Sequence, residues 1–212
     1  MDEKEIQRLL KAMTVEEKCG ELEMTELPQE RGNIRLLSMG CIPRLGIRGI
    51  VTSDNTNGPH EYFRMTDEER EQNKDRLSTC YPPVSALGAS WSEKLAEEIG
   101  AAVGQDAKSY GIQCVLRPGM NIKRSPLCGR NYEYFSEDPV LTGVLAAAYV
   151  NGIQGENVAA CIKHYCANNQ EFSRMSVNCI ISERALREIY LRGFQIAIDK
   201  SSPWTLMSSY NK

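Results

Sequence analysis

The stretch Asn121-Ile-Lys-Arg-Ser-Pro-Leu-Cys-Gly-Arg-Asn-Tyr-Glu-Tyr-Phe-Ser-Glu-Asp-Pro139 separates an apolar, strand-like segment from a helical pattern, and it decides how the chain is interpreted. It combines basic residues, a Gly129-Arg130-Asn131 triplet, three carboxylates and three aromatic rings. A long polar loop between a strand and a helix is where α/β proteins place functional residues, because the scaffold holds both of its ends. We therefore expect functional chemistry at this loop and at equivalent loops along the chain.

Outward from this loop, short apolar segments alternate with amphipathic helical patterns. The expected strands cover residues 47–53, 112–116, 158–162 and 204–208, and the expected helices cover residues 90–110, 138–155 and 182–200. Near-continuous apolar strands between helices indicate a parallel sheet covered by helices. The chain has neither a glycine-rich dinucleotide fingerprint after its first strand nor a GxxxxGK[ST] loop, which disfavours a nucleotide-binding open sheet.

The regions around this repeat are predicted from local signals. Residues 2–24 predict two short helices, the second opened by the capping box Thr14-Val-Glu-Glu17. Residues 25–46 are interrupted by glycine and proline and are interpreted as a loop, and residues 55–83 as a polar surface excursion with a charged segment. The helix over residues 90–110 is expected to bury one apolar stripe, formed by Leu95, Ile99, Val103 and Ala107.

Each expected strand ends in polar side chains, which are Asp54, Arg117, Lys163-His164 and Tyr210-Asn211. Convergence from the C-terminal ends of successive strands is the pattern of a (β/α)₈ barrel active site. A full barrel has eight strands in typically about 250 residues, whereas four strands are expected here. The sequence therefore predicts an α/β fold over residues 1–212, the first half of a TIM-type barrel with about four parallel strands and covering helices. An unclosed barrel has open edges, so the remainder of the barrel or an associating chain is expected as a partner.

Composition and charge disfavour several classes of protein. The 212 residues are 42% hydrophobic and 25% charged, with a formal net charge of -3. This balance lacks the electrostatic footprint of a nucleic-acid or membrane-surface protein. No apolar run approaches the roughly 20 residues that span a bilayer. The acidic start, Met1-Asp-Glu-Lys-Glu5, lacks the apolar core of a signal peptide, so a cytoplasmic location is expected.

Cysteine and histidine usage favours a reduced protein without a metal. The eight cysteines form no CxxC pair, and several lie in apolar segments. Reduced core thiols are therefore expected rather than a disulfide framework. Because His60 and His164 are the only histidines, no metal site is expected.

Candidate functional groups at the strand ends each have a structural alternative. From its position alone, Asp54 is equally consistent with a structural role, as a turn or helix-capping residue. Arg130 could brace its own loop by pairing with Glu133 or Glu137. Lys163 and His164 are adjacent on a strand, where neighbouring side chains point to opposite faces, so only one of them is expected to enter a pocket.

The loop Cys166-Ala-Asn-Asn-Gln-Glu-Phe-Ser-Arg174 adds amides, a carboxylate and a guanidinium group. Many such donors without a nucleophile–base pair favour a polyhydroxylated ligand. No catalytic pair of carboxylates can be assigned from spacing. The residues alone therefore predict a partial parallel barrel with a polar, sugar-compatible pocket.

Three segments resemble the N-terminal domain of glycoside hydrolase family 3, especially bacterial β-glucosidases. They are Gly119–Pro139, Lys163-His-Tyr-Cys-Ala-Asn-Asn-Gln-Glu171 with Arg174, and Met207-Ser-Ser-Tyr-Asn211. The resemblance runs from about residue 14 to the end of the chain and is specific, because several long motifs occur in the same order. It implies a (β/α)₈-type barrel followed by an α/β sandwich domain, and a retaining glycosidase that acts on β-glucosides without a cofactor. It also implies that the sugar at the cleaved position is bound by Asp54, Arg130, Lys163, His164, Arg174 and Tyr210, with Met207 lining the same pocket.

The chain departs from the family pattern in two ways. The family usually has aspartate, glycine, proline and histidine in sequence, whereas this chain reads Asp54-Asn-Thr-Asn-Gly-Pro-His60, with extra residues after the aspartate. The family's nucleophilic aspartate lies in a Ser-Asp-Trp motif, which the resemblance places after residue 212, and its acid/base carboxylate usually comes from the second domain. The chain is therefore expected to supply sugar-binding residues, to contain no catalytic residue, and to be inactive alone.

Other functions stay open on the sequence. One alternative is a non-catalytic sugar-binding or scaffold half-barrel that a partner chain completes. Within the family, the N-acetylglucosaminidase branch ranks lower, because the segment Lys163–Glu171 looks more like the two-domain glucosidases. Xylosidase or arabinosidase specificity also stays open, since the residues that contact the leaving group lie largely outside this chain.

Overall fold

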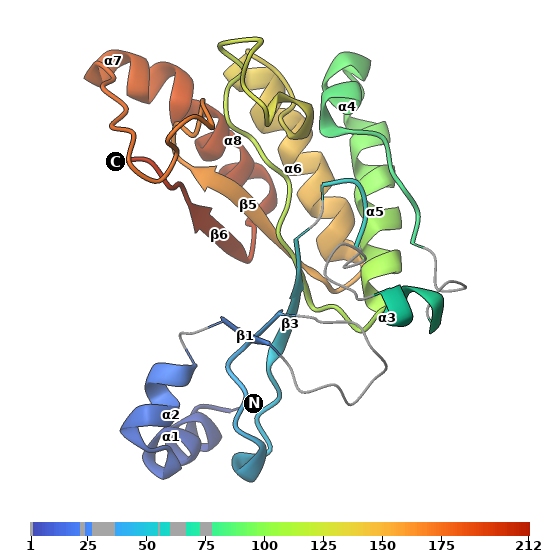
Figure 1. Cartoon of the computed structure of the whole chain (residues 1–212), viewed down its shortest axis with the longest axis vertical. Helices are drawn as coiled ribbons and strands as arrows, with labels where there is room; N and C mark the ends of the chain where they lie inside the picture. The colour runs from blue at the N-terminus through green and yellow to red at the C-terminus, as the bar shows by residue number, and fades with distance from the viewer. Residues whose placement is uncertain (1, 22–23, 27–36, 55, 60–66, 73–77) are drawn as a thin grey trace. The chain divides into compact units, whose positions relative to one another are not determined.

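The computed structural model describes residues 2–21, 24–26, 37–54, 56–59, 67–72 and 78–212 (Figure 1). The chain divides into two compact units. The first consists of Met1–Ser53 with Glu61–Leu77, and the second of Asp54–His60 with Ser78–Lys212. All seven candidate sugar-binding residues belong to the second unit, so the geometry of the site is internal to that unit.

The first unit begins with the two predicted helices, α1 (Glu3–Ala12) and α2 (Val15–Gly20). The predicted capping box is present, because Glu17 N donates to Thr14 Oγ1 at 3.2 Å and Thr14 N donates to Glu17 Oε2 at 2.8 Å. Arg44 pairs with Glu17 and donates to Ala12 O at 2.8 Å. The two helices are therefore tied to a segment about thirty positions later in the chain.

The expectation that residues 25–46 form only a loop is wrong. β1 (Met24–Glu26) pairs antiparallel with β2 (Leu37–Met39), which pairs antiparallel with β3 (Ile50–Ser53). The chain returns from β2 to β3 through a 3₁₀ turn, η1 (Pro43–Leu45), which ends at Gly46 with φ 70°. Three-residue strands are too short to show the alternation that identifies a strand, so only pairing between segments reveals them. Residues 27–36 lie outside the described residues.

The charged segment of the predicted surface excursion contains one short helix, α3 (Asp67–Gln72). Its Asp67, Glu68 and Glu71 side chains are exposed, in agreement with the expectation of a solvated segment. The neighbouring residues 60–66 and 73–77, like residue 55, are outside the described part of the chain.

Three parallel strands form the sheet of the second unit, β4 (Cys114–Val115), β5 (Ala159–Tyr165) and β6 (Thr205–Ser208). All three lie where strands are predicted, and β5 continues three residues beyond its predicted end. One face of this sheet carries an apolar cluster of Cys114, Leu116, Ala159 and Cys161, against which Met207 packs. Because side chains alternate along a strand, the buried Val115, Ala160 and Ile162 face the opposite side.

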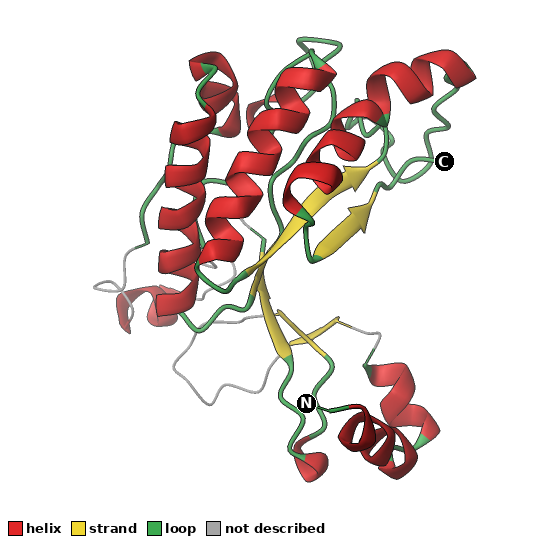
Figure 2. Cartoon of the chain, turned by 180° about the vertical axis from the view of Figure 1, so that it is seen from behind, coloured by secondary structure: helices red, strands yellow, loops and turns green. Residues whose placement is uncertain are grey.

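Helices cover one face of these strands, with α6 (Pro139–Gly155) between α5 (Glu93–Ser109) and α8 (Arg192–Ser201) (Figures 1 and 2). The predicted start of α6 is confirmed, because Leu141 N donates to Asp138 Oδ1 at 2.6 Å and Pro139 occupies the first turn. No helix among the described residues is both long and apolar enough to cross a membrane.

One predicted helix starts later than expected, and another is interrupted. The helix expected over residues 90–110 is preceded by α4 (Val84–Ser90), and the break falls at Trp91, which has a left-handed φ of 55°. Ser92 then caps α5 by accepting from Leu95 N at 3.2 Å. The helix expected over residues 182–200 starts with α7 (Glu183–Ala185) and a π-helical turn, Leu186–Tyr190, before α8.

Glycines allow α5 and α6 to approach closely. A Cβ atom on Gly100 would lie 2.3 Å from Tyr149 O, and one on Gly152 would lie 2.1 Å from Glu97 O. The buried face of α5 consists of small residues, which are Ala96, Gly100, Val103, Gly104 and Ala107. The predicted stripe is therefore right for Val103 and Ala107 but wrong for Leu95, which is exposed, and Ile99, which is half-buried. Close contact between helices requires small side chains, whereas the predicted stripe consists mainly of larger apolar ones.

Candidate functional site

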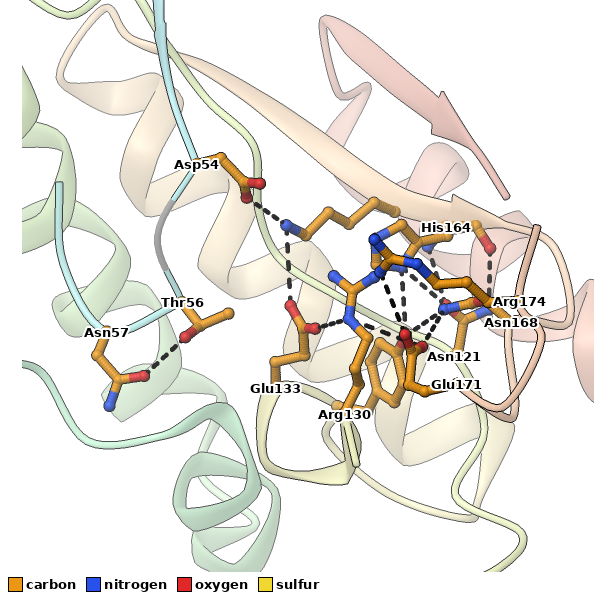
Figure 3. A network of polar contacts seen from close by, with 12 residues as sticks. Asp54, Thr56, Asn57, Asn121, Arg130, Glu133, His164, Asn168, Glu171 and Arg174 are labelled. Atoms are coloured by element: carbon orange, nitrogen blue, oxygen red, sulfur yellow. Dashed lines mark hydrogen bonds and ion pairs between the residues drawn. The ribbon is translucent and has the colours of Figure 1, made fainter. Parts of the chain in front are cut away.

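The candidate residues of the second unit meet at the ends of strands. Asp54 comes directly after β3 in the chain, and Lys163 and His164 lie near the end of β5. Arg130 and Glu133 come from the loop that precedes α6, and Glu171 and Arg174 from the loop after β5. Figure 3 shows these loops presenting their labelled side chains to one another.

Six charged side chains alternate in sign through the site, in the order Asp54, Lys163, Glu133, Arg130, Glu171 and Arg174. Lys163 Nζ lies 2.8 Å from Asp54 Oδ1 and 3.7 Å from Glu133 Oε2. Arg130 Nε donates to Glu133 Oε1 and lies 4.0 Å from Glu171 Oε1. Arg174 Nη1 lies 3.1 Å from Glu171 Oε2. We call these six residues the charge chain.

The charge chain is buried in its centre and reaches solvent at both ends. The side chains of Lys163 and Glu133 are each 2% exposed, whereas Asp54 is 46% and Arg174 40% exposed. Burial by itself lowers the pKa of Arg130, but the hydrogen bond and charge of Glu133 outweigh it and hold that pKa above its usual value. The central charges are thus stabilised by one another rather than by water.

His164 lies beside the charge chain and is held in its neutral form. Burial, followed by the positive charges of Arg130, Lys163 and Arg174, lowers the pKa of His164 to about 2. Its Nδ1 lies 3.3 Å from the hydroxyl of Tyr134, a buried residue. A neutral imidazole has one donor and one acceptor nitrogen. Because Nδ1 contacts Tyr134 and also Asn121 Oδ1 at 3.3 Å, a ligand would be contacted through Nε2.

Strand alternation alone predicts that only one of Lys163 and His164 enters the site, and that expectation is wrong. Lys163 pairs with Met207 of β6, whereas the next pair is Tyr165 with Ser208, so the register shifts at His164. Such an irregularity inserts an extra residue and redirects its side chain. Both side chains therefore reach the same cluster of contacts. The Lys163–His164 peptide bond is cis.

Three uncharged residues that the sequence did not identify as candidates hold this cluster in place. Asn121 Nδ2 donates to His164 O at 2.8 Å, and His164 N donates back to Asn121 Oδ1 at 3.0 Å. Asn168 Nδ2 donates to Tyr134 OH at 3.0 Å and to Glu171 Oε1 at 3.2 Å. Asn121 and Tyr134 lie within the opening stretch of sequence, and Asn168 within the amide-rich loop, but nothing local distinguishes them from their neighbours.

The two candidates from the end of the chain lie at different places. The Arg174 guanidinium carbon lies 4.4 Å from the centroid of the Tyr210 ring, which lies 6.3 Å from the His164 ring. Tyr210 is therefore part of the polar cluster. Met207 packs on the apolar cluster of the sheet, on the same face as its register partner Lys163.

This arrangement suits a neutral ligand with many hydroxyl groups. It offers ammonium, guanidinium, imidazole and phenol groups, together with carboxylates that can accept. Each of its carboxylates, on Asp54, Glu133 and Glu171, is already paired with a lysine or arginine. Among the described residues, no group of three or more His, Cys, Asp or Glu side chains could hold a metal ion.

Comparison with known proteins agrees with this interpretation. Residues 14–212 match the profile of the Glycosyl hydrolase family 3 N terminal domain. The chain is 41% identical over 210 residues to thermostable beta-glucosidase B of Acetivibrio thermocellus, covering 98% of this chain and 26% of that protein. It is 40% identical over 167 residues to an exo-alpha-(1->6)-L-arabinopyranosidase of Bifidobacterium breve, covering 79% of this chain and 22% of that protein.

Solved structures show the same similarity. Beta-glucosidase 3B from Thermotoga neapolitana in complex with glucose is 42% identical, with a TM-score of 0.87 over 98% of this chain and 29% of that one. The predicted fold class, the first half of a TIM-type barrel, is confirmed. The chain spans about a quarter of the length of the curated relatives it matches.

Proposed function

The chain belongs to glycosyl hydrolase family 3, and from that membership we propose that it forms the sugar-binding part of a retaining β-glucosidase. The observation that carries the proposal is the convergence of six of the seven candidate residues, which are Asp54, Arg130, Lys163, His164, Arg174 and Tyr210. The ligand is a β-linked glucoside or a similar sugar. No cofactor takes part in the proposed reaction.

Each of these residues has a role that its surroundings support. Lys163 and Asp54, which already contact each other, bind neighbouring hydroxyl groups of the sugar as donor and acceptor. Arg130 offers a planar fork of donors, and the neutral His164 adds one more polar contact. Tyr210 and Met207 border the sugar. Fixed donors of this kind orient the substrate and stabilise the transition state.

The bond-breaking carboxylates are proposed to come from outside residues 1–212. Retaining hydrolysis uses two carboxyl groups about 5–5.5 Å apart, one as the nucleophile and one as the acid/base. The three carboxylates of the charge chain are engaged by cations, which supports a role in orienting those cations. In this proposal residues 1–212 form the N-terminal part of the barrel domain, and the remaining barrel and an α/β sandwich domain complete the enzyme.

The proposal is tested by binding and by complementation. We expect the chain to bind glucose in a titration followed by NMR, and Lys163→Met to weaken that binding at least tenfold. We expect no hydrolysis of an aryl β-glucoside by the chain alone, and hydrolysis after addition of a chain that carries the rest of the barrel and the second domain. Absence of glucose binding both by the chain alone and by the complemented chain would overturn the proposal. Hydrolysis by the pure chain alone, if Lys163→Met abolishes it, would also overturn the proposal.

A second specificity has direct support, because arabinopyranosidases and β-glucosidases match this chain at nearly the same identity. In the complemented enzyme, aryl β-glucoside and aryl α-L-arabinopyranoside are compared by kcat/KM. We expect the glucoside to be the better substrate, and the reverse order would establish the second specificity. Glucose binding without hydrolysis in the complemented state would indicate the non-catalytic scaffold.

A cytoplasmic location is part of the proposal. All eight cysteines are free thiols in the structure, and three of them are exposed. Exposed free thiols are typical of a reducing compartment. Cell fractionation followed by immunodetection tests this, and recovery of the protein outside the cytoplasm would contradict it.

A further inference from the structure

Glu133 is a buried carboxylate placed between the two most buried cations of the charge chain. Its side chain is 2% exposed, its Oε1 accepts from Arg130 Nε, and its Oε2 lies 3.7 Å from Lys163 Nζ. Among the described residues, no hydrogen bond reaches Oε2. That oxygen therefore acts on Lys163 through its charge, whereas Oε1 fixes the direction of the Arg130 side chain.

The positive and negative charges of the charge chain are equal in number. It contains the three carboxylates of Asp54, Glu133 and Glu171 and the three cations of Lys163, Arg130 and Arg174. His164, which lies beside them, is neutral. The formal charge of the cluster is therefore zero, and Glu133 is the member that contacts two cations at once in its buried centre.

We infer that Glu133 is a specificity-determining and positioning residue, which cancels the charge of the sugar pocket so that it selects uncharged sugars over anionic ones. The inference rests on the proposed function. Lysine and arginine donors bind carboxylates more strongly than hydroxyl groups, so a pocket built from them needs a compensating anion to favour an uncharged sugar. Specificity of this kind comes from an element that disfavours the wrong ligand.

The test compares glucose with glucuronate, which carries a carboxylate in place of the hydroxymethyl group. Glu133→Gln keeps the shape of the side chain and removes its charge, leaving one uncompensated positive charge in the buried centre. We expect wild type to prefer glucose, and Glu133→Gln to shift the ratio of the two dissociation constants toward glucuronate by about tenfold, since one unbalanced charge acts strongly in a water-poor site. Because the steric difference between the sugars is the same in both proteins, the change in the ratio isolates the charge.

The matched control is Glu137→Gln. Glu137 is an exposed carboxylate in the same loop, four positions after Glu133. Its charge is screened by solvent, so we expect the ratio of the two dissociation constants to stay within twofold of wild type. Dissociation constants are measured by NMR titration at pH 7 and constant ionic strength for all three proteins.

If Glu133→Gln does not fold, Glu171→Gln takes its place. Glu171 belongs to the same charge chain but is 24% exposed, so the shift toward glucuronate is expected in the same direction and to be smaller. If the variant binds both sugars more weakly by the same factor, so that the ratio of the two dissociation constants is unchanged, the inference is overturned. The glutamate would then be only a structural support. Wild type that binds neither sugar, both alone and with the complementing chain, would overturn the proposed function as well, which distinguishes the two failures.

Discussion

Two buried regions of the second unit, the contact between α5 and α6 and the centre of the charge chain, are built by opposite means. Where α5 meets α6, the contact is made by glycine and other small residues, and backbone atoms of the two helices come close together. At the charge chain, the buried side chains are long and charged, and they contact one another through ion pairs. The helix contact requires residues with few side-chain atoms, whereas the charge chain requires particular charged side chains.

The difference shows which change each region tolerates. Where two backbones are packed together, there is no room for one additional methyl group. The residues of this helix contact are not among the candidate ligand-binding residues. A buried ion pair tolerates little change in charge, because a single remaining charge has neither water nor a partner. We expect shape to govern mutations at the helix contact and charge to govern mutations at the site.

The largest effect is expected for Lys163→Met, which keeps the length of the side chain and removes its charge. Asp54 and the buried Glu133 both lose this cation. The free energy of unfolding should fall by about 3 kcal/mol, as in other buried pairs that lose one partner. Urea unfolding measures it, with Lys94→Met as the control, because Lys94 is an exposed helix residue. Equal losses in the two variants would contradict the assignment of buried charge.

At the helix contact, Gly152→Ala should reduce the free energy of unfolding by roughly 2–3 kcal/mol. The added Cβ would lie 2.1 Å from Glu97 O and 2.7 Å from Ala101 N, which are backbone atoms that cannot turn away. Gly155→Ala, at the end of the same helix, is the control. Nothing lies within 4 Å of a Cβ there, so the effect should be within about 1 kcal/mol and stabilising. The comparison would fail if both variants were equally stable.

The site should also lose stability in acid through His164, whereas the helix contact has no corresponding group. Burial and three nearby cations lower the pKa of His164 to about 2, while an unfolded histidine takes up a proton below about pH 6.5. The unfolded state therefore binds more protons as the pH falls, and the free energy of unfolding should drop by about 2 kcal/mol between pH 8 and pH 5. Chemical unfolding of His164→Gln over this range should show a drop smaller by that amount, and an identical pH dependence would contradict the prediction.

A smaller change in the free energy of unfolding is expected at the start of α6. This helix connects the two regions, because it follows the loop of Arg130 and Glu133 and packs on α5. Asp138→Ala removes the cap that accepts from Leu141 N and should cost about 1 kcal/mol. Glu137→Ala, at the exposed neighbouring position, serves as the control and should have no measurable effect on thermal unfolding. A larger effect at residue 137 than at residue 138 would be inconsistent with the observed cap.

The smallest effect is expected for an ion pair on the surface. Arg184 and Glu188 pair at 3.1 Å, but their side chains are 85% and 61% exposed. Arg184→Ala should change the free energy of unfolding by less than about 0.5 kcal/mol, because solvent already screens both charges. A change as large as that of Lys163→Met would show that burial does not distinguish the two kinds of ion pair.

Local signals were enough to predict the helices that begin at a cap. The capping box of Thr14 with Glu17 and the Asp138–Pro139 start are written in adjacent residues, and both are present. The predicted strands of the second unit are also present, because buried parallel strands are short apolar runs. By contrast, β1 and β2 were missed, since three-residue strands exist only through their pairing.

By itself, the sequence determined the fold class and most of the residues that meet at the site. The sequence motifs identify the family, and the polar residues at the strand ends predict which side chains meet at the site. The family resemblance implied that Lys163 and His164 both bind the sugar, but only the tertiary structure shows how both enter the site, through a shift in register, and that Glu133 lies between two cations. Lys163 and Asp54 are 109 positions apart, so no local pattern encodes their contact. Burial of a charge depends on every segment that surrounds it, and that environment exists only in the folded chain.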